Sequence, residues 1–149
     1  MWRRSYARNG RTDERPCDRR AFGIHRTFLR RDGFGKVSRM MLGPAGVIRL
    51  CERITNGLGL AEGIETALAV AQRVGWGPVW AAGSAGNIAK FPVLIQTTLN
   101  IFADHDDSCA GIKAARACAE RWADAGECLI HKPPEGKDWD QATLGEDVP

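Results

Sequence analysis

The stretch "IFADHDDSCAG" (101–111) runs from apolar residues into three aspartates within four positions. The apolar residues are typical of a buried strand, and Asp104, Asp106 and Asp107 follow where that strand ends. Carboxylates so close together repel one another and are costly to desolvate. Two interpretations follow: a polar turn before the next helix, or a site for a divalent cation at the edge of a sheet. The surrounding sequence decides between them.

The sequence on both sides of this stretch alternates between strand and helix patterns. Short apolar runs are followed by stretches with apolar residues at helical spacing, and Gly75 and Gly126 are suitable helix ends. This order is typical of an α/β fold, in which four parallel strands form a sheet flanked by helices. The sequence predicts strands at 58–62, 78–83, 97–104 and 128–134, helices at 63–75 and 108–126, and a short helix or turn at 84–91.

The composition divides the chain into three segments. Residues 1–20 are rich in arginine and poor in apolar residues, which predicts a basic, flexible tail. Residues 21–56 predict a small β-rich lobe, with a hairpin around "RRDGFGK" (30–36), and residues 57–149 form the α/β domain. The net charge is +3, but residues 1–50 hold 13 Lys and Arg against 4 Asp and Glu. A basic front of this kind indicates either a contact with a polyanion or a solvated tail.

Acidic residues gather at the predicted carboxyl ends of the strands. Glu62 ends the first strand, Asp104 and Asp106 follow the third, and Asp138 and Asp140 follow the fourth. The carboxyl ends of parallel strands lie at one edge of a sheet, where ligands of such folds bind. Converging carboxylates need a neutralising cation, and oxygen ligands favour Mg²⁺ or Mn²⁺. The sequence therefore favours the metal site over the polar turn.

Two further acids have alternative explanations. Glu65 either joins the site, one helical turn after Glu62, or complements the dipole of the first helical turn, which we favour. Asp107 is either a third ligand or the N-cap of helix 108–126, and capping is the better explanation. The Gly-rich "AAGSAGN" (81–87), with Ser84 as a cap, either lets backbone amides approach a phosphate or makes a tight strand–helix connection.

Three motifs in order resemble the signatures of the Toprim domain. They are "LAEGIETALA" (60–69), "IFADHDDSCAG" (101–111) and "GKDWDQ" (136–141). Residues 23–50 are similar to the segment that precedes the Toprim core in phage- and plasmid-type DNA primases. The resemblance implies metal-dependent nucleotidyl transfer or phosphodiester chemistry. It matches Glu62 to the family's general acid/base glutamate, leaving open whether Glu62 is base or ligand. It matches Asp104 and Asp106 to the metal ligands, and Asp138 or Asp140 to the later acid.

Basic residues in the primase-like segment are candidates for binding a nucleic acid or a triphosphate, since cationic side chains contact phosphates without reading sequence. A solvated hairpin face is the alternative. Lys113, near the start of the long helix, reaches either phosphate or solvent. The resemblance implies DNA or RNA and nucleoside triphosphates as partners, with a helicase or another replication protein beside them. The candidates in the hairpin are His25, Arg26, Arg30, Arg31 and Lys36.

Other functions compete with a primase. A metal-dependent nuclease would use the same acids, and a nucleic-acid-binding or scaffolding module would use no catalysis. A topoisomerase is disfavoured, because its tyrosine nucleophile has one candidate, Tyr6, in the basic tail. The five cysteines have no C-x-x-C spacing, so neither zinc nor a disulfide framework is expected. Without a secretory signal or a long apolar run, the sequence predicts a cytoplasmic protein without a membrane contact.

Overall fold

The computed structural model describes residues 23–32, 35–44, 46–51, 54, 57–104, 109–133 and 139. The chain divides into two compact units, Met1–Gly46 and Val47–Pro149. Among the described residues, no helix has both the length and the apolar character needed to cross a membrane.

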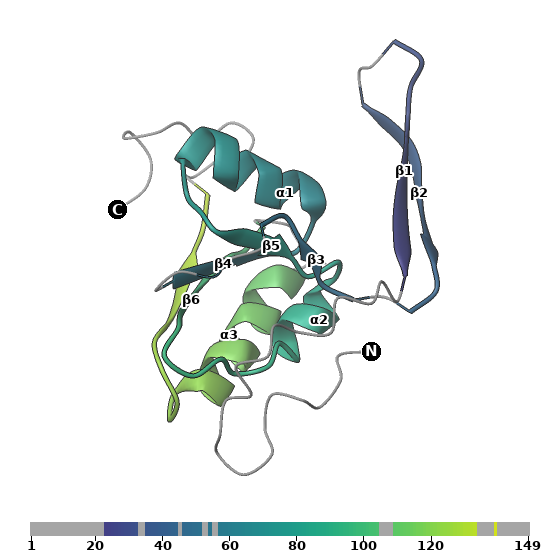
Figure 1. Ribbon diagram of the computed structural model, residues 1–149. Coiled ribbons are helices and arrows are strands. Elements are labelled where there is room, and N and C mark those ends of the chain that lie inside the picture. Colours follow the sequence, from purple (N-terminus) through teal and green to yellow (C-terminus); the bar gives the residue numbers. More distant parts are fainter. Residues whose placement is uncertain are drawn as a thin grey trace. The chain divides into compact units, whose positions relative to one another are not determined.

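The second unit is built on one five-stranded sheet with the order β3-β5-β4-β6-β7 (Figure 1). Four of its strands are parallel, which confirms the predicted α/β fold. The fifth strand, β3, runs antiparallel along β5 at the edge. The strands are β3 (Ile48–Arg49), β4 (Gly57–Ala61), β5 (Val79–Ala81), β6 (Thr98–Phe102) and β7 (Cys128–His131).

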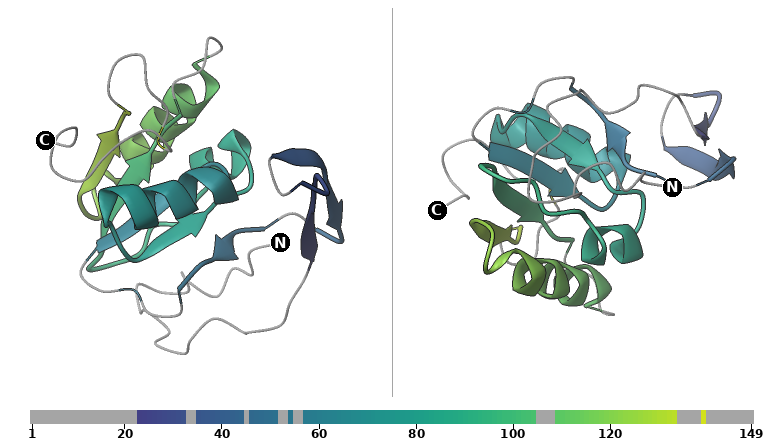
Figure 2. Two further views of the ribbon diagram at one scale, coloured as in Figure 1. Left: turned by 90° about the horizontal axis from the view of Figure 1, so that it is seen from above. Right: turned by 60° about the horizontal axis from the view of Figure 1, so that its bottom comes forward.

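Helices cover both faces of this sheet. One face carries α1 (Ile64–Ala69), which continues as a π-helical turn, η1 (Val70–Val74). The other carries α2 (Ala85–Ala89) and α3 (Ala110–Trp122) (Figures 1 and 2). The η1 turn ends at Gly75, whose positive φ of 69° favours glycine. This is the end that the sequence predicted for helix 63–75.

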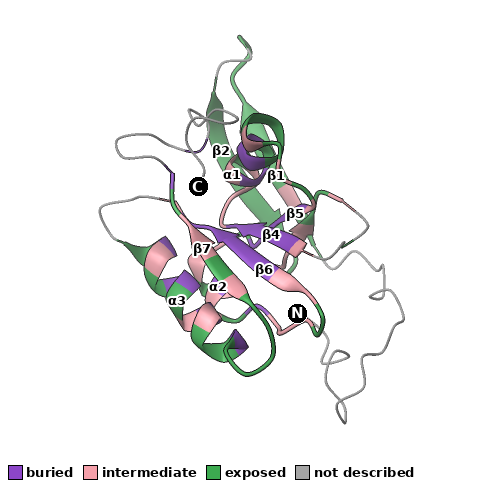
Figure 3. Ribbon diagram, turned by 90° about the vertical axis from the view of Figure 1, so that its left-hand side faces the viewer, coloured by how far each residue is buried: buried purple, intermediate pink, exposed green. Residues whose placement is uncertain are grey.

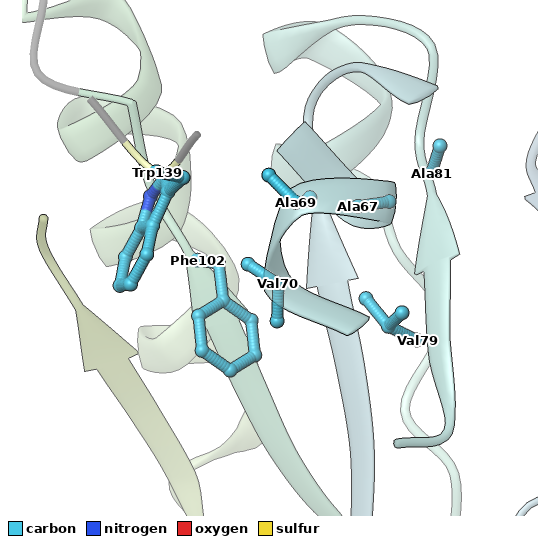
Figure 4. Packing of buried hydrophobic residues seen from close by; sticks show 8 residues of the cluster. Ala67, Ala69, Val70, Val79, Ala81, Phe102 and Trp139 are labelled. Carbon is cyan, nitrogen blue, oxygen red and sulfur yellow. The ribbon is translucent and has the colours of Figure 1, made fainter. Parts of the chain in front are cut away.

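The core follows the alternation of side chains along the strands. On the α1 face, Ala61 of β4, Val79 and Ala81 of β5 and Phe102 of β6 pack against Ala67, Ala69 and Val70 (Figure 4). On this same face, a Cβ at Gly59 would lie 3.1 Å from side-chain atoms of Phe102, Trp76 and Val79. Any larger residue at this position would therefore push the aromatic rings away from the sheet.

In the first unit, the described residues form a two-stranded antiparallel hairpin of β1 (Ile24–Leu29) and β2 (Lys36–Leu42). The hairpin expected around the Asp-Gly turn is therefore present. Every residue of the two strands except His25 is exposed (Figure 3). An isolated hairpin of two strands has little stability of its own in water. Its exposed large apolar residues are Ile24, Phe28, Leu29, Val37, Met40, Met41 and Leu42.

A polar pair lies inside the sheet between β6 and β7. Asn100 is 2% exposed, and the His131 Nε2–H donates to its Oδ1 over 2.8 Å. The imidazole stacks on Phe102, with the ring centroids 5.0 Å apart. Burial lowers the pKa of His131 below its usual 6.5, because the charged imidazolium is disfavoured away from water. The neutral form therefore holds the pair together.

This pair predicts a loss of stability in acid. As the pH falls through 6.5, the unfolded chain takes up a proton at His131 and the folded chain does not. The free energy of unfolding should then decrease by at most about 1.4 kcal/mol per pH unit from this residue. Urea unfolding of the wild type and of His131→Gln at about pH 7.5 and about pH 5.5 measures the effect. The variant should lose less stability between the two pH values. Equal losses would contradict the assignment.

Candidate metal centre

The site begins with the parallel pairing of β4 and β6. Ala61, the last residue of β4, is paired with Phe102, the last residue of β6. Glu62 directly follows β4, and Asp104 lies two residues beyond β6. Both residues are partly buried. The predicted convergence of these two acids at one edge of the sheet therefore has a structural basis in adjacent, in-register strands.

The start of α3 lies against both acids. A Cβ placed on Gly111 would lie 3.8 Å from Oε2 of Glu62, and 3.4 Å and 3.5 Å from the backbone O and N of Asp104. The glutamate carboxylate and the Asp104 backbone thus meet at one point beside the first turn of α3. The amino end of a helix carries a partial positive charge, which stabilises nearby carboxylates.

Thr66 of α1 binds the carboxylate of Asp104 from the other side. Its hydroxyl donates to Asp104, with Oγ1 3.0 Å from Oδ1 and 3.3 Å from Oδ2. Asp104 has the same strand parity as Phe102 and so lies on the α1 face of the sheet. Sequence reasoning predicted Asp104 and missed Thr66. The available signal was the position of Thr66 four residues after Glu62, one turn into the helix that follows the first acid.

The "AAGSAGN" segment is a tight connection between β5 and α2. Gly83 N donates to Glu62 O over 2.8 Å, so the parallel pairing continues past the strand ends. Ser84 caps α2 by accepting from Asn87 N over 3.2 Å, which confirms its predicted capping role. Asn87 Nδ2 donates to Ala82 O over 2.7 Å. The bond from Gly83 fixes the backbone of Glu62 directly, and the other two bonds hold the segment that contains Gly83.

Trp139, the described residue of the third motif, lies at the same edge. Its side chain is 2% exposed, and its Nε1–H donates to Ala103 O over 3.1 Å, one residue before Asp104. Its ring meets Phe102 edge-on at 5.2 Å (Figure 4). Sequence reasoning used the flanking acids, Asp138 and Asp140, and gave no role to this tryptophan. Both acids lie outside the described residues.

The other predicted site residues are distributed as follows. Asp106 lies outside the described residues. Lys113 is exposed in the first turns of α3, and Glu65 is exposed in the first turn of α1. The prediction that Asp107 caps helix 108–126 is wrong: α3 begins at Ala110 with Cys109 at its N-cap, at φ 52° and without a side-chain cap. The hairpin candidates His25, Arg26, Arg30, Arg31 and Lys36 belong to the first unit.

The described donors at the edge are carboxylates, which suit a hard cation with oxygen ligands, such as Mg²⁺ or Mn²⁺. Within the described part of the chain, no group of three or more His, Cys, Asp or Glu residues comes together. Glu62 and Asp104 thus form the described part of the donor set. The remaining acids of the second and third signatures fall on residues that the structure does not describe.

Comparison with known proteins identifies the class. Residues 57–146, more than half of the chain, match the family model described as the Toprim domain. The chain therefore belongs to the Toprim family, a metal-binding fold found in primases, nucleases and topoisomerases. Toprim domains typically bind Mg²⁺. No curated protein and no solved structure matches the chain.

The burial of Trp139 predicts that it stabilises the domain. Trp139→Ala should lower the free energy of unfolding by about 3–5 kcal/mol, because a large ring leaves the core. Trp139→Phe should cost less, since it keeps an aromatic contact with Phe102 but leaves Ala103 O without its indole donor. Urea unfolding measures both, with Leu68→Ala on the exposed side of α1 as the control. A Trp139→Ala variant as stable as this control would contradict the packing.

Proposed function

We propose that this chain is the catalytic domain of a primase-like nucleotidyltransferase that joins nucleotides on a DNA template with Mg²⁺ or Mn²⁺. The meeting of Glu62 and Asp104 at adjacent strand ends of a Toprim domain carries the proposal. The similarity of residues 23–50 to the segment before the Toprim core of phage- and plasmid-type primases is its second support.

In this proposal Asp104 holds the metal together with Asp106, and Asp138 or Asp140 completes the site. The last two are chosen because they flank Trp139 in the sequence, and Trp139 binds Ala103 O. Bound Mg²⁺ would neutralise the triphosphate and lower the pKa of the attacking primer hydroxyl. Glu62 either accepts the proton of that hydroxyl on its carboxylate or serves as a further ligand.

The hairpin supplies the proposed contacts with nucleic acid. His25, Arg26, Arg30, Arg31 and Lys36 would bind template or triphosphate oxygens. All but His25 are exposed. Arg30 also forms an ion pair with Asp32, in which Nε of Arg30 lies 3.2 Å from Oδ2 of Asp32. Arg26 lies over the ring of Phe28 at 5.8 Å, an arrangement that also suits stacking of an unpaired base. Lys113 adds a positive charge to α3, two residues beyond Gly111. The proposed partners are DNA or RNA, nucleoside triphosphates and a helicase or another replication protein.

The metal assignment predicts that the double variant Asp104→Asn/Asp106→Asn loses binding of Mg²⁺ and of Mg²⁺-dependent nucleoside triphosphate. The metal-free variant should be more stable than the wild type, because repulsion between carboxylates is relieved. Calorimetric titration and urea unfolding measure these two effects. Asp124→Asn is the matched control, since it removes an exposed carboxylate beyond the far end of α3. Binding that is unchanged in the double variant would remove the assignment.

The product of the reaction decides between the enzymes of this family. The wild type should extend or start a strand on single-stranded DNA when given nucleoside triphosphates and Mg²⁺. Cleavage of the DNA without synthesis would show that the protein is a nuclease that uses the same carboxylates, and not a primase. Metal binding without either product would favour a binding or scaffolding module.

The hairpin assignment predicts a loss of affinity for single-stranded DNA in Arg31→Ala/Lys36→Ala. Each lost phosphate contact should reduce the slope of log affinity against log salt by roughly 0.7. Fluorescence anisotropy at several salt concentrations measures this slope. Arg73→Ala/Arg116→Ala is the control, because it removes the same charge from exposed positions on two helical segments of the other unit. Equal slopes for the two double variants would exclude a specific role for the hairpin.

A further inference from the structure

The hydrogen bond between Thr66 and Asp104 affects which cation the proposed metal site can bind. Thr66 Oγ1 lies 3.0 Å from one carboxylate oxygen of Asp104 and 3.3 Å from the other. Two distances this similar place the hydroxyl between the two oxygens, on the inner side of the carboxylate. A cation that is held by both oxygens of one carboxylate must occupy this same space.

We propose that Thr66 is a positioning and specificity-determining residue, which restricts Asp104 to binding a cation through one oxygen. The inference rests on the proposed metal site. Mg²⁺ demands near-ideal octahedral geometry and fits ligation by single oxygens. Ca²⁺ accepts six to eight ligands at longer distances and frequently binds both oxygens of a carboxylate. A hydroxyl held between the two oxygens therefore favours Mg²⁺ over Ca²⁺.

The position of Thr66 is set by its surroundings. A threonine in a helix often donates to the carbonyl four residues earlier, which here is Glu62 O. That carbonyl already accepts from Gly83 N at 2.8 Å, and the Thr66 hydroxyl donates to Asp104. The helix itself is held down by Ala67 and Ala69, which are buried in the core. Thr66 is also β-branched, so its side chain has few rotamers.

The hydrogen bond also acts on the orientation of Asp104. A donor to the ionised carboxylate stabilises its charged form and limits its rotation. Residues that orient a metal ligand in this way typically change metal affinity by about 10–100-fold when they are replaced. Thr66 is not expected to touch the substrate, and its effect should appear in metal binding before any reaction takes place.

The test compares Mg²⁺ and Ca²⁺ titrations of the full chain by calorimetry. Thr66→Val keeps the shape of the side chain and removes the hydroxyl, and Thr66→Ser keeps the hydroxyl. Thr66→Val should lose about 10–100-fold in Mg²⁺ affinity. Its Ca²⁺ affinity should fall less or rise, so the ratio of the two affinities moves toward Ca²⁺. Thr66→Ser should keep the ratio of the wild type.

Two further variants protect the test. Thr66→Ala removes the hydroxyl with a residue that favours helices, and it replaces Thr66→Val should the latter fail to fold. Thr98→Val is the matched control at the opposite end of β6, where the Thr98 hydroxyl lies 3.4 Å from Oε2 of Glu127. This control loses a hydroxyl–carboxylate contact of the same kind and should leave both cation affinities unchanged.

The outcomes separate this inference from the proposed function. Mg²⁺ binding that disappears in Asp104→Asn, together with an unchanged Mg²⁺ to Ca²⁺ ratio in Thr66→Val and Thr66→Ala, overturns the role of Thr66 and leaves the metal site standing. A wild type that binds neither cation overturns the proposed function and the inference with it. A shift in the ratio that Thr66→Ser does not show supports the inference.

Discussion

The parallel pairing of β4 with β6 is the constraint on which the rest of the structure depends. Because Ala61 and Phe102 end these strands in register, the residues that follow them leave the sheet at the same edge. Glu62 and Asp104 then stand side by side without a tight turn or a strained backbone to bring them there. The hydrogen bonds of the two strands provide the positional accuracy that the proposed metal site needs.

Several elements then hold the Asp104 end of this pair. Thr66 reaches Asp104 from α1, Gly111 allows α3 to approach it, and Trp139 binds the neighbouring carbonyl of Ala103. Each contact comes from a different part of the chain. Around Asp104, the described part of this edge is therefore lined by polar groups and packed rings. This arrangement explains how mutually repelling carboxylates can be placed beside a core that is otherwise apolar.

The two units have different physical characters. The Toprim unit has a continuous buried core on both faces of its sheet. The strands of the hairpin, as far as the structure describes them, contain no buried residue, and they expose large apolar residues together with arginines and lysine. A surface of this composition is suited to contacts with phosphates and unpaired bases, for which both charge and stacking contribute. The proposed function assigns the metal to the Toprim unit and the contacts with nucleic acid to the hairpin.

The sequence by itself determined the α/β fold, the approximate helices and strands, the hairpin and the strand ends at which Glu62 and Asp104 lie. These features depend on local periodicity, turn residues and the order of elements. All three can be read from residues that are close together in the sequence. Only the tertiary structure decided that Thr66 binds Asp104, that Trp139 binds Ala103, that β3 joins the edge of the main sheet and that α3 starts after Cys109. Thr66 and Asp104 are 38 residues apart in the chain. Their contact depends on which turn of α1 meets the end of β6, and that is set by the packing of whole elements, which no local pattern encodes.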